Sequence, residues 1–226
     1  MIKWLFRHDF HFKKTLICLV TIWVIILVLI LLVWPSNSML EYQLFYEHYQ
    51  IESKVIINQT LKICLPFLVL IMVMEHDQPY LRPLFAYFGV VKIQIYKYIM
   101  YYLVYSFVFA YLIIFVEAIK SYLPVVFSLT ADDFNFYLQL YLDNMILMNM
   151  IFYFIRDKRR ILSLLFGLLF YFISLYYEDS NSKIYYLLPL YHPHYKDFTF
   201  AIIYKLWYLL FGLCLCVRKN SMETIQ

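Results

Sequence analysis

One acidic side chain lies deep inside an apolar stretch of this sequence. Asp143 stands near the middle of residues 134–155, with Asn144 beside it and Asn149 further along the same stretch. Charged side chains at membrane depth are costly, and they usually face a protein interior or a water-filled path. An aspartate is too short to reach the membrane surface from there, so we expect Asp143 to face protein. A carboxylate in that position can pair with a base, carry a proton or line the path of a cargo.

Two lysines in other apolar stretches are candidates for the pairing base. Lys62 follows Asn58 by four residues, so both would lie on one face of a helix, and Lys205 lies in the last apolar stretch. Two interpretations stay open. In the first, Asn58, Lys62, Asp143 and Asn144 form a translocation seam or a dimer interface, with Asp143 near Lys62. In the second, the lysines extend to the membrane surfaces and Asp143 pairs with one of them without a further role.

The other reactive residue types do not form a catalytic or metal centre. The cysteines lie inside apolar stretches, where a thiol usually acts as a small hydrophobic side chain; they are Cys18, Cys64, Cys214 and Cys216. His192 and His194 are too few ligands for a closed metal site. The sequence contains no H-E-x-x-H motif, no redox C-x-x-C motif and no P-loop motif G-x-x-x-x-G-K-[ST]. We therefore expect no metal, no cofactor and no enzymatic activity in this chain.

The composition indicates which elements hold these residues. Of the 226 residues, 64% are hydrophobic and 15% are charged, whereas soluble domains carry roughly 25% charged residues. About 20 apolar residues in a helix cross a hydrocarbon core about 30 Å thick. The candidate stretches are 15–34, 55–74, 98–116, 134–155, 161–177 and 198–217, of which 161–177 is the shortest. We predict an all-α integral membrane protein, in which residues 1–226 form one transmembrane domain of six helices.

The distribution of basic residues predicts the orientation in the membrane. Cytoplasmic loops carry an excess of Lys and Arg. Most of the basic residues fall in segments that would share one side; they are Lys3, Arg7, Lys13, Lys14, Arg82, Lys92, Lys97, Arg156, Lys158, Arg159, Arg160, Arg218 and Lys219. We therefore expect both termini in the cytoplasm of a multi-pass protein.

Three segments of this arrangement each have two interpretations. Residues 1–14 could form an interfacial helix on the cytoplasmic leaflet or a frayed basic tail. The stretch 15–34 could be a cleaved signal peptide, although its length favours a retained transmembrane helix. Residues 178–197 could form a plain outer loop or a segment that re-enters the outer leaflet.

The segment between the second and third stretches, "MEHDQPYLRPLFAYFGVVKIQIYKY", has an apolar pattern of its own. Its spacing of i, i+3, i+4 and i+7 predicts one apolar helical face formed by Leu81, Leu84, Phe85 and Phe88. Gly89 offers a stop for this helix. A helix of about two turns is not stable alone, so its apolar face needs a partner.

This arrangement resembles the ABC type-2 transporter permease family. Its members have about six spans, cytoplasmic ends and a short coupling helix between spans two and three. The family's glutamate at the end of span two corresponds to Glu75, and its basic residue at the start of span three corresponds to Lys97. The turn "RDKRR" resembles the family's second cytoplasmic turn. Pro79 and Pro83 depart from the family, which more often has Gly or Thr there, and this puts the start of the helix in question.

The resemblance implies a division of labour. A separate ATPase subunit would bind the coupling helix and hydrolyse ATP with Mg, because this chain has no P-loop. The chain would form a homodimer or a heterodimer with a similar permease in a bacterial cell membrane, in contact with lipid and without nucleic acid. The cargo would be amphipathic, such as a peptide or toxin, a lipid or a drug, and it would be exported.

Other functions remain open at this point. The apolar face of residues 81–88 could be an inert interfacial helix. The protein could then be a non-transporting sensor, scaffold or immunity protein. A secondary carrier coupled to protons through Asp143 is disfavoured by the few glycines and the lack of an internal repeat.

Overall fold

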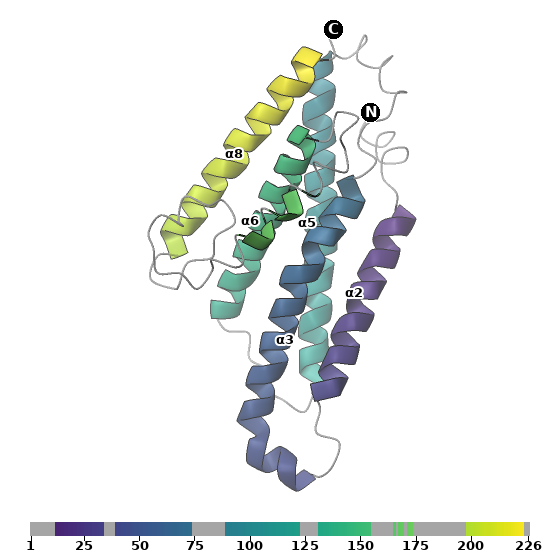
Figure 1. Ribbon diagram of the computed structural model, residues 1–226, viewed down its shortest axis with the longest axis vertical. Coiled ribbons are helices and arrows are strands. Elements are labelled where there is room, and N and C mark those ends of the chain that lie inside the picture. Colours follow the sequence, from purple (N-terminus) through teal and green to yellow (C-terminus); the bar gives the residue numbers. More distant parts are fainter. Residues whose placement is uncertain are drawn as a thin grey trace.

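The computed structural model describes residues 12–33, 39–73, 89–122, 131–154, 165, 167–169, 171–173 and 198–223. Apart from Gly89, all of these residues are helical, which confirms the predicted all-α class for this part of the chain. The long helices form an elongated bundle (Figure 1). They are α2 (Phe12–Val33), α3 (Met39–Val73), α5 (Val90–Tyr122), α6 (Ala131–Phe154) and α8 (Phe198–Glu223).

Three of the described helices are long and apolar enough to cross a membrane. Their apolar segments are Lys54–Val73 in α3, Val91–Ala118 in α5 and Ala201–Arg218 in α8, and α2 contains a shorter apolar segment, Lys14–Leu29. Large apolar side chains cover the outside of the bundle, including Leu32, Phe107 and Trp207, which are 75%, 76% and 68% exposed. Such a surface suits hydrocarbon rather than water. The chain is therefore a multi-pass membrane protein.

The helix bounds differ most from the apolar stretches at the starts of α3 and α5. The apolar pattern predicts a loop before the second stretch, but α3 begins at Met39 and runs for 35 residues, because no glycine or proline interrupts the polar segment before Lys54. At about 50 Å long, α3 exceeds the hydrocarbon core and extends beyond it. The pattern also predicts a helix from residue 98, but α5 begins at Val90.

The early start of α5 follows from the backbone at Gly89. This glycine has φ +79°, in the left-handed region that favours glycine, and its carbonyl accepts a hydrogen bond from the Ile93 N–H at 3.2 Å. As a consequence, Lys97 does not open the helix as expected. It lies two turns inside α5, and only 2% of its surface is exposed.

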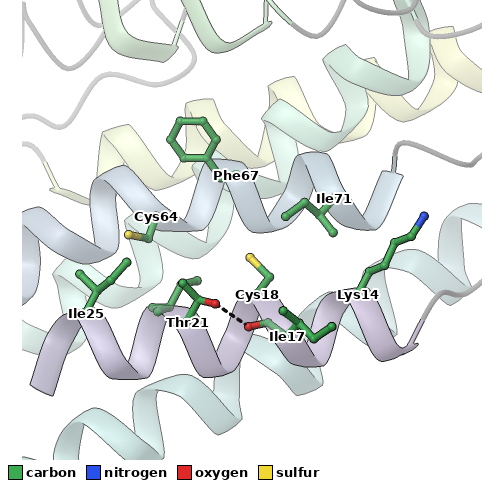
Figure 2. Close-up of a pocket in the computed structure, with 9 residues that line it drawn as sticks. Lys14, Ile17, Cys18, Thr21, Ile25, Cys64, Phe67 and Ile71 are labelled. Atoms are coloured by element: carbon green, nitrogen blue, oxygen red, sulfur yellow. Dashed lines mark hydrogen bonds between the residues drawn. The ribbon is translucent and has the colours of Figure 1, made fainter.

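The contacts fix the direction of each helix. α2 and α3 are antiparallel, with Lys14 opposite Ile71 and Ile25 beside Cys64 (Figure 2). α5 and α6 are also antiparallel, because residues 102 and 117 of α5 contact residues 149 and 137 of α6. α3 runs parallel to α6, since residues 54 and 62 of α3 contact residues 133 and 136 of α6. As a result, α2 begins, α3 ends, α5 begins and α6 ends at the same end of the bundle (Figure 1).

α6 and α8 are neighbours that run parallel to each other. Asp143 pairs with Lys205, and Asn149, further along α6, contacts Leu209 and Cys216, further along α8. α8 therefore starts at the opposite end of the bundle from the end of α6 (Figure 1). The described residues 165, 167–169 and 171–173 lie between these helices in the sequence and are called the return segment.

Two described pieces of this return segment lie against the bundle interior. A Cβ atom at Gly167 would lie 3.4 Å from Leu147 on α6. The Tyr171 side chain is 1% exposed, and its hydroxyl donates a hydrogen bond to the backbone carbonyl of Lys62 at 3.0 Å. The return segment is thus packed between α6 and α3 at these points.

The Tyr171 contact has a local cause in α3. Pro66 lies inside this helix and has no N–H, so the carbonyl of Lys62, four residues earlier, loses its usual helical donor. In a membrane interior such a carbonyl needs another partner. The Tyr171 hydroxyl supplies the missing hydrogen bond, so a break in the α3 ladder becomes an attachment point for the return segment.

Candidate functional site

A buried ion pair joins α6 to α8 in the interior of the bundle. The Lys205 Nζ lies 2.6 Å from the Asp143 Oδ1, and the two side chains are 3% and 0% exposed. Burying two charges carries a large desolvation penalty, which the attraction between them offsets only when the geometry is close. The parallel packing of the two helices places both groups at the same depth.

Asn149 forms a second connection between the same helices. Its Nδ2 donates to the Leu209 carbonyl at 3.0 Å, its Oδ1 accepts from the Tyr102 hydroxyl on α5, and the Cys216 thiol donates to its backbone carbonyl at 3.1 Å. The Asn149 side chain is 3% exposed. One residue of α6 therefore fixes the positions of α5 and α8.

Gly212 allows α8 to approach α6 closely enough for these contacts. A Cβ atom at Gly212 would lie 3.3 Å from the Asn149 Nδ2 and 3.4 Å from the Asn149 Cβ. The Asn149 amide is held by hydrogen bonds on both sides, so it could not move aside freely. The helix contact thus depends on a residue without a side chain.

The buried polar cluster is defined here as Tyr102, Asp143, Asn144, Asn149 and Lys205. Asn144 is fully buried beside Asp143, and its Nδ2 donates to the Leu140 carbonyl at 2.8 Å. Its Oδ1 accepts no hydrogen bond within the described part of the chain. An unsatisfied buried acceptor next to a charged pair is a costly arrangement, and such groups are concentrated at functional positions.

Tyrosines form the α5 side of this region. The Tyr105 ring stacks on Tyr141 at 5.7 Å between centroids, and Tyr141 is hydrogen-bonded to the Ser106 hydroxyl at 2.6 Å. Tyr105 is fully buried and close enough to interact electrostatically with Asp143, and its hydroxyl has no hydrogen-bond partner among the described residues. Tyr105 therefore contributes a buried hydroxyl group on the α5 side of this region.

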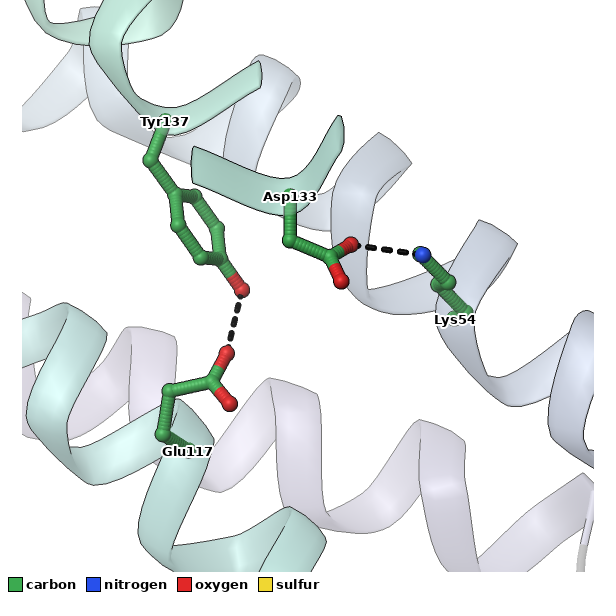
Figure 3. Close-up of polar contacts among 4 residues, drawn as sticks. All are labelled: Lys54, Glu117, Asp133 and Tyr137. Atoms are coloured by element: carbon green, nitrogen blue, oxygen red, sulfur yellow. Dashed lines mark hydrogen bonds and ion pairs between the residues drawn. The ribbon is translucent and has the colours of Figure 1, made fainter. Parts of the chain in front are cut away.

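A second set of polar contacts connects α3, α5 and α6 near the start of α6. The Lys54 Nζ on α3 lies 2.6 Å from the Asp133 Oδ1 on α6, and the Tyr137 hydroxyl donates to Glu117 on α5 at 2.8 Å (Figure 3). Lys54 is 35% exposed, so water screens this pair far more than the pair inside the bundle. These contacts join the first turns of α6 to the middle of α3 and to the last turns of α5.

The prediction that Asp143 faces protein is confirmed, since its side chain is completely buried. Its partner is Lys205 rather than Lys62, and Lys205 does not extend to the membrane surface as one interpretation proposed. The Lys62 Nζ instead lies 5.5 Å from the centroid of the Phe136 ring. Asn58 is half-buried on α3. Asp143 and Asn149 of α6 therefore contact α8, whereas Asp133 contacts Lys54 of α3.

The residues expected to bind an ATPase lie mostly outside the described part of the chain. This applies to Glu75, Leu81, Leu84, Phe85 and Phe88. The "RDKRR" turn and residues 178–197 lie outside it as well. Lys97 is described, but it is buried in α5 and not displayed on the surface of a loop.

Sequence reasoning missed Tyr102 and Gly212. The chain contains 24 tyrosines, so nothing in the sequence distinguishes Tyr102 from the others. Glycine occurs only three times, and a glycine inside the last apolar stretch was a usable signal for a close helix contact.

The chemistry open to the cluster is that of charge pairing and hydrogen bonding. No group of three or more His, Cys, Asp or Glu side chains lies close enough to hold a metal ion within the described residues. A buried Asp–Lys pair flanked by amides can exchange partners when the helices around it move. Comparison with protein-family models, with curated proteins and with solved structures finds no match to this chain.

Proposed function

We propose that this chain is the membrane-spanning permease subunit of an ATP-driven exporter. A separate ATPase subunit would hydrolyse ATP with Mg, and this chain would move the cargo. The observation that carries the transport part of the proposal is the buried Asp143–Lys205 pair between α6 and α8. The ATPase partner is inferred from the resemblance of the segment 74–98 to a coupling helix.

The ion pair supports a moving interface for an energetic reason. Replacing a buried ion pair with packed apolar residues is often neutral or stabilising, so the pair is not needed for stability alone. It fixes the register of α8 on α6, and Asn149 fixes it a second time. Two sets of directional contacts on one helix interface favour discrete positions, which is the property that a helix shift between two states requires.

The directions of the helices are compatible with six spans and cytoplasmic ends. α6 and α8 are parallel, so a further crossing between them would make the number of spans even. The basic residues Lys14, Lys92 and Arg218 lie where α2 begins, α5 begins and α8 ends, at one end of the bundle. By the positive-inside rule this end faces the cytoplasm. We place the protein in a bacterial cell membrane, as a homodimer or as a heterodimer with a similar permease.

The cargo that suits this protein is amphipathic. The outer surface of the bundle is apolar and the polar groups are internal. An amphipathic peptide, lipid or drug could therefore keep its apolar part in contact with the membrane while it moves.

Co-purification tests the ATPase partner. We expect the detergent-extracted protein to bring down a P-loop ATPase, and Phe85→Asp to release it by placing a charge on the apolar face of residues 81–88. Ala86→Asp is the matched control, because residue 86 projects from the opposite side of that helix. An extract without an ATPase, or equal release by both variants, would refute the proposal.

A second candidate is a non-transporting sensor or immunity protein. The specific observation in its favour is that Asp143 is fully buried, so the pair could serve as a permanent internal brace. This candidate needs no ATPase. It would be preferred if no ATPase co-purified while cells lacking the protein became sensitive to a membrane-active peptide.

A further inference from the structure

The backbone of α3 has a position at which it can bend. Pro66 lies inside this helix and leaves the Lys62 carbonyl without its helical donor. Prolines are a main cause of sharp kinks in helices, because they interrupt the ladder of backbone hydrogen bonds. The parts of α3 before and after Pro66 are therefore free to differ in direction, unless other contacts hold them in line.

The part of α3 before Pro66 is held by directional contacts with α6. The Lys54 Nζ lies 2.6 Å from the Asp133 Oδ1, and the Lys62 Nζ lies 5.5 Å from the centroid of the Phe136 ring. Both partners are on the same helix, one turn apart. This part of α3 therefore has a fixed position on α6.

The part of α3 after Pro66 is held in a different way. Residues 67–73 are all apolar, and apolar packing has no preferred direction. A groove between α2 and α3, with a cavity volume of about 580 Å³, lies along this part and is lined on α3 by Cys64, Phe67 and Ile71 (Figure 2). The groove leaves room for residues 67–73 to tilt toward α2.

The return segment contacts α3 on both sides of the break. The Tyr171 hydroxyl donates to the Lys62 carbonyl at 3.0 Å, before Pro66. The adjacent Phe172 ring lies 6.5 Å from the Phe67 ring between centroids, after Pro66. Two neighbouring aromatic residues thus span the position at which α3 can bend.

We propose that Pro66 is a hinge in α3 and that the return segment is a strap across it, fastened by the Tyr171 hydroxyl. While this hydrogen bond is made, residues 67–73 keep their direction, and when it breaks they tilt toward α2. The part of α3 after Pro66 is about 10 Å long. A tilt of about 20°, the size of a sharp helix kink, moves its end by about 4 Å.

The hinge gives the proposed exporter a connection between its ATPase and the bundle. α3 ends at Val73, and the segment proposed to bind the ATPase follows directly in the sequence. A displacement of that segment reaches Pro66 through one short apolar piece of helix. This consequence rests on the proposed function, whereas the hinge and the strap do not.

Hydrogen–deuterium exchange of the protein in lipid nanodiscs tests the strap. Tyr171→Phe should speed amide exchange about fivefold in peptides from residues 67–73, the effect of losing one ordinary hydrogen bond. Peptides from residues 54–61 should exchange as in the wild-type protein. In the Pro66→Ala background, where the helix supplies its own donor, the same change should have no effect. Tyr137→Phe is the matched control, because its hydroxyl bonds to Glu117 and not to α3.

Spin labels measure the tilt itself. α3 and α8 lie on different sides of α6, so labels at Ile71 and Trp207 report a distance across the bundle (Figure 1). Over about five residues from the hinge, a tilt of about 20° should lengthen this distance by about 3 Å in Tyr171→Phe. The distance from Val55 to Trp207 should stay constant, since Val55 precedes the hinge. Pro66→Ala should abolish the change.

The results that would overturn the hinge differ from those that would refute the transport function. Faster exchange along the whole of α3, an equal effect of Tyr171→Phe in the Pro66→Ala background, or an unchanged distance from Ile71 to Trp207 would each exclude the hinge. Both measurements use the protein without an ATPase. Their outcome is therefore separate from that of the co-purification experiment.

Discussion

The central residue of this protein is Asp143, whose charge is balanced inside the bundle by Lys205. From the sequence alone, Asp143 could have paired with either lysine. The structure shows that its partner comes from the last helix of the bundle. The consequences of a substitution at either position follow from this pairing.

Loss of one charge should be more harmful than loss of both. Asp143→Leu leaves the Lys205 ammonium buried without its carboxylate, and we expect a loss of about 3–5 kcal/mol in the free energy of unfolding. Asp143→Leu combined with Lys205→Leu should recover most of this loss. Thermal unfolding in detergent measures both. Equal stability of the single variant and the wild-type protein would show that the pair is not formed.

Pro66 and Tyr171 should be coupled through the Lys62 carbonyl. Tyr171→Phe removes its hydrogen bond donor and should destabilise the protein by about 1 kcal/mol. In the Pro66→Ala background the helix supplies a donor to this carbonyl, so the same change should have less effect. A double-mutant cycle on unfolding free energies measures the difference. Additive effects would contradict this explanation of the contact.

At the scale of the elements, the α6–α8 interface depends on a close approach at Gly212. The other glycine that faces α6 is Gly167, where a Cβ atom would make ordinary contacts at 3.4 and 3.6 Å. The two positions differ in what the added methyl group would meet. At Gly167 these are aliphatic side chains, and at Gly212 it is the hydrogen-bonded amide of Asn149.

Alanine substitutions at these glycines should therefore have different effects. Both gain about 1 kcal/mol of helix propensity. Gly212→Ala also pushes against Asn149, so we expect it to be less stable than Gly167→Ala by about 1 kcal/mol or more. Thermal unfolding of the two variants side by side provides the measurement. The opposite order would mean that α8 does not pack on Asn149 as described.

The sequence predicted the elements better than it predicted their contacts. A long apolar stretch indicates a membrane helix, because a helix satisfies all of its backbone hydrogen bonds internally within the hydrocarbon core. The length of a stretch does not indicate which helices contact each other. Lys62 and Lys205 are both lysines within apolar stretches, so either of them could have paired with Asp143. The early start of α5 depended on the φ angle of Gly89, and the role of Tyr171 depended on a carbonyl freed by Pro66.

At the scale of the whole molecule, the parallel pair α6 and α8 is the main topological feature. α6 ends and α8 begins at opposite ends of the bundle, and the two helices are in direct contact. One end of the bundle carries Lys14, Lys92 and Arg218, and the other carries Asp132 and Asp133. The charges thus distinguish the two ends.

Chemical labelling tests the orientation that these charges imply. In a variant without native cysteines, Asp132→Cys should react with a membrane-impermeant maleimide in intact cells. Lys92→Cys should react only after permeabilisation. Both positions are exposed at opposite ends of the bundle, so they serve as controls for each other. Reversed labelling would place the termini outside and would refute the cytoplasmic position of the coupling segment.

We propose that α8 shifts on α6 when a partner ATPase binds nucleotide. Spin labels at Phe134 on α6 and Ile203 on α8, both 59% exposed, report the distance between these helices by pulsed electron paramagnetic resonance. We expect different distance distributions in the nucleotide-free complex and in the complex with a non-hydrolysable ATP analogue, and no difference in Phe85→Asp. Identical distributions in both states of the wild-type complex would contradict it.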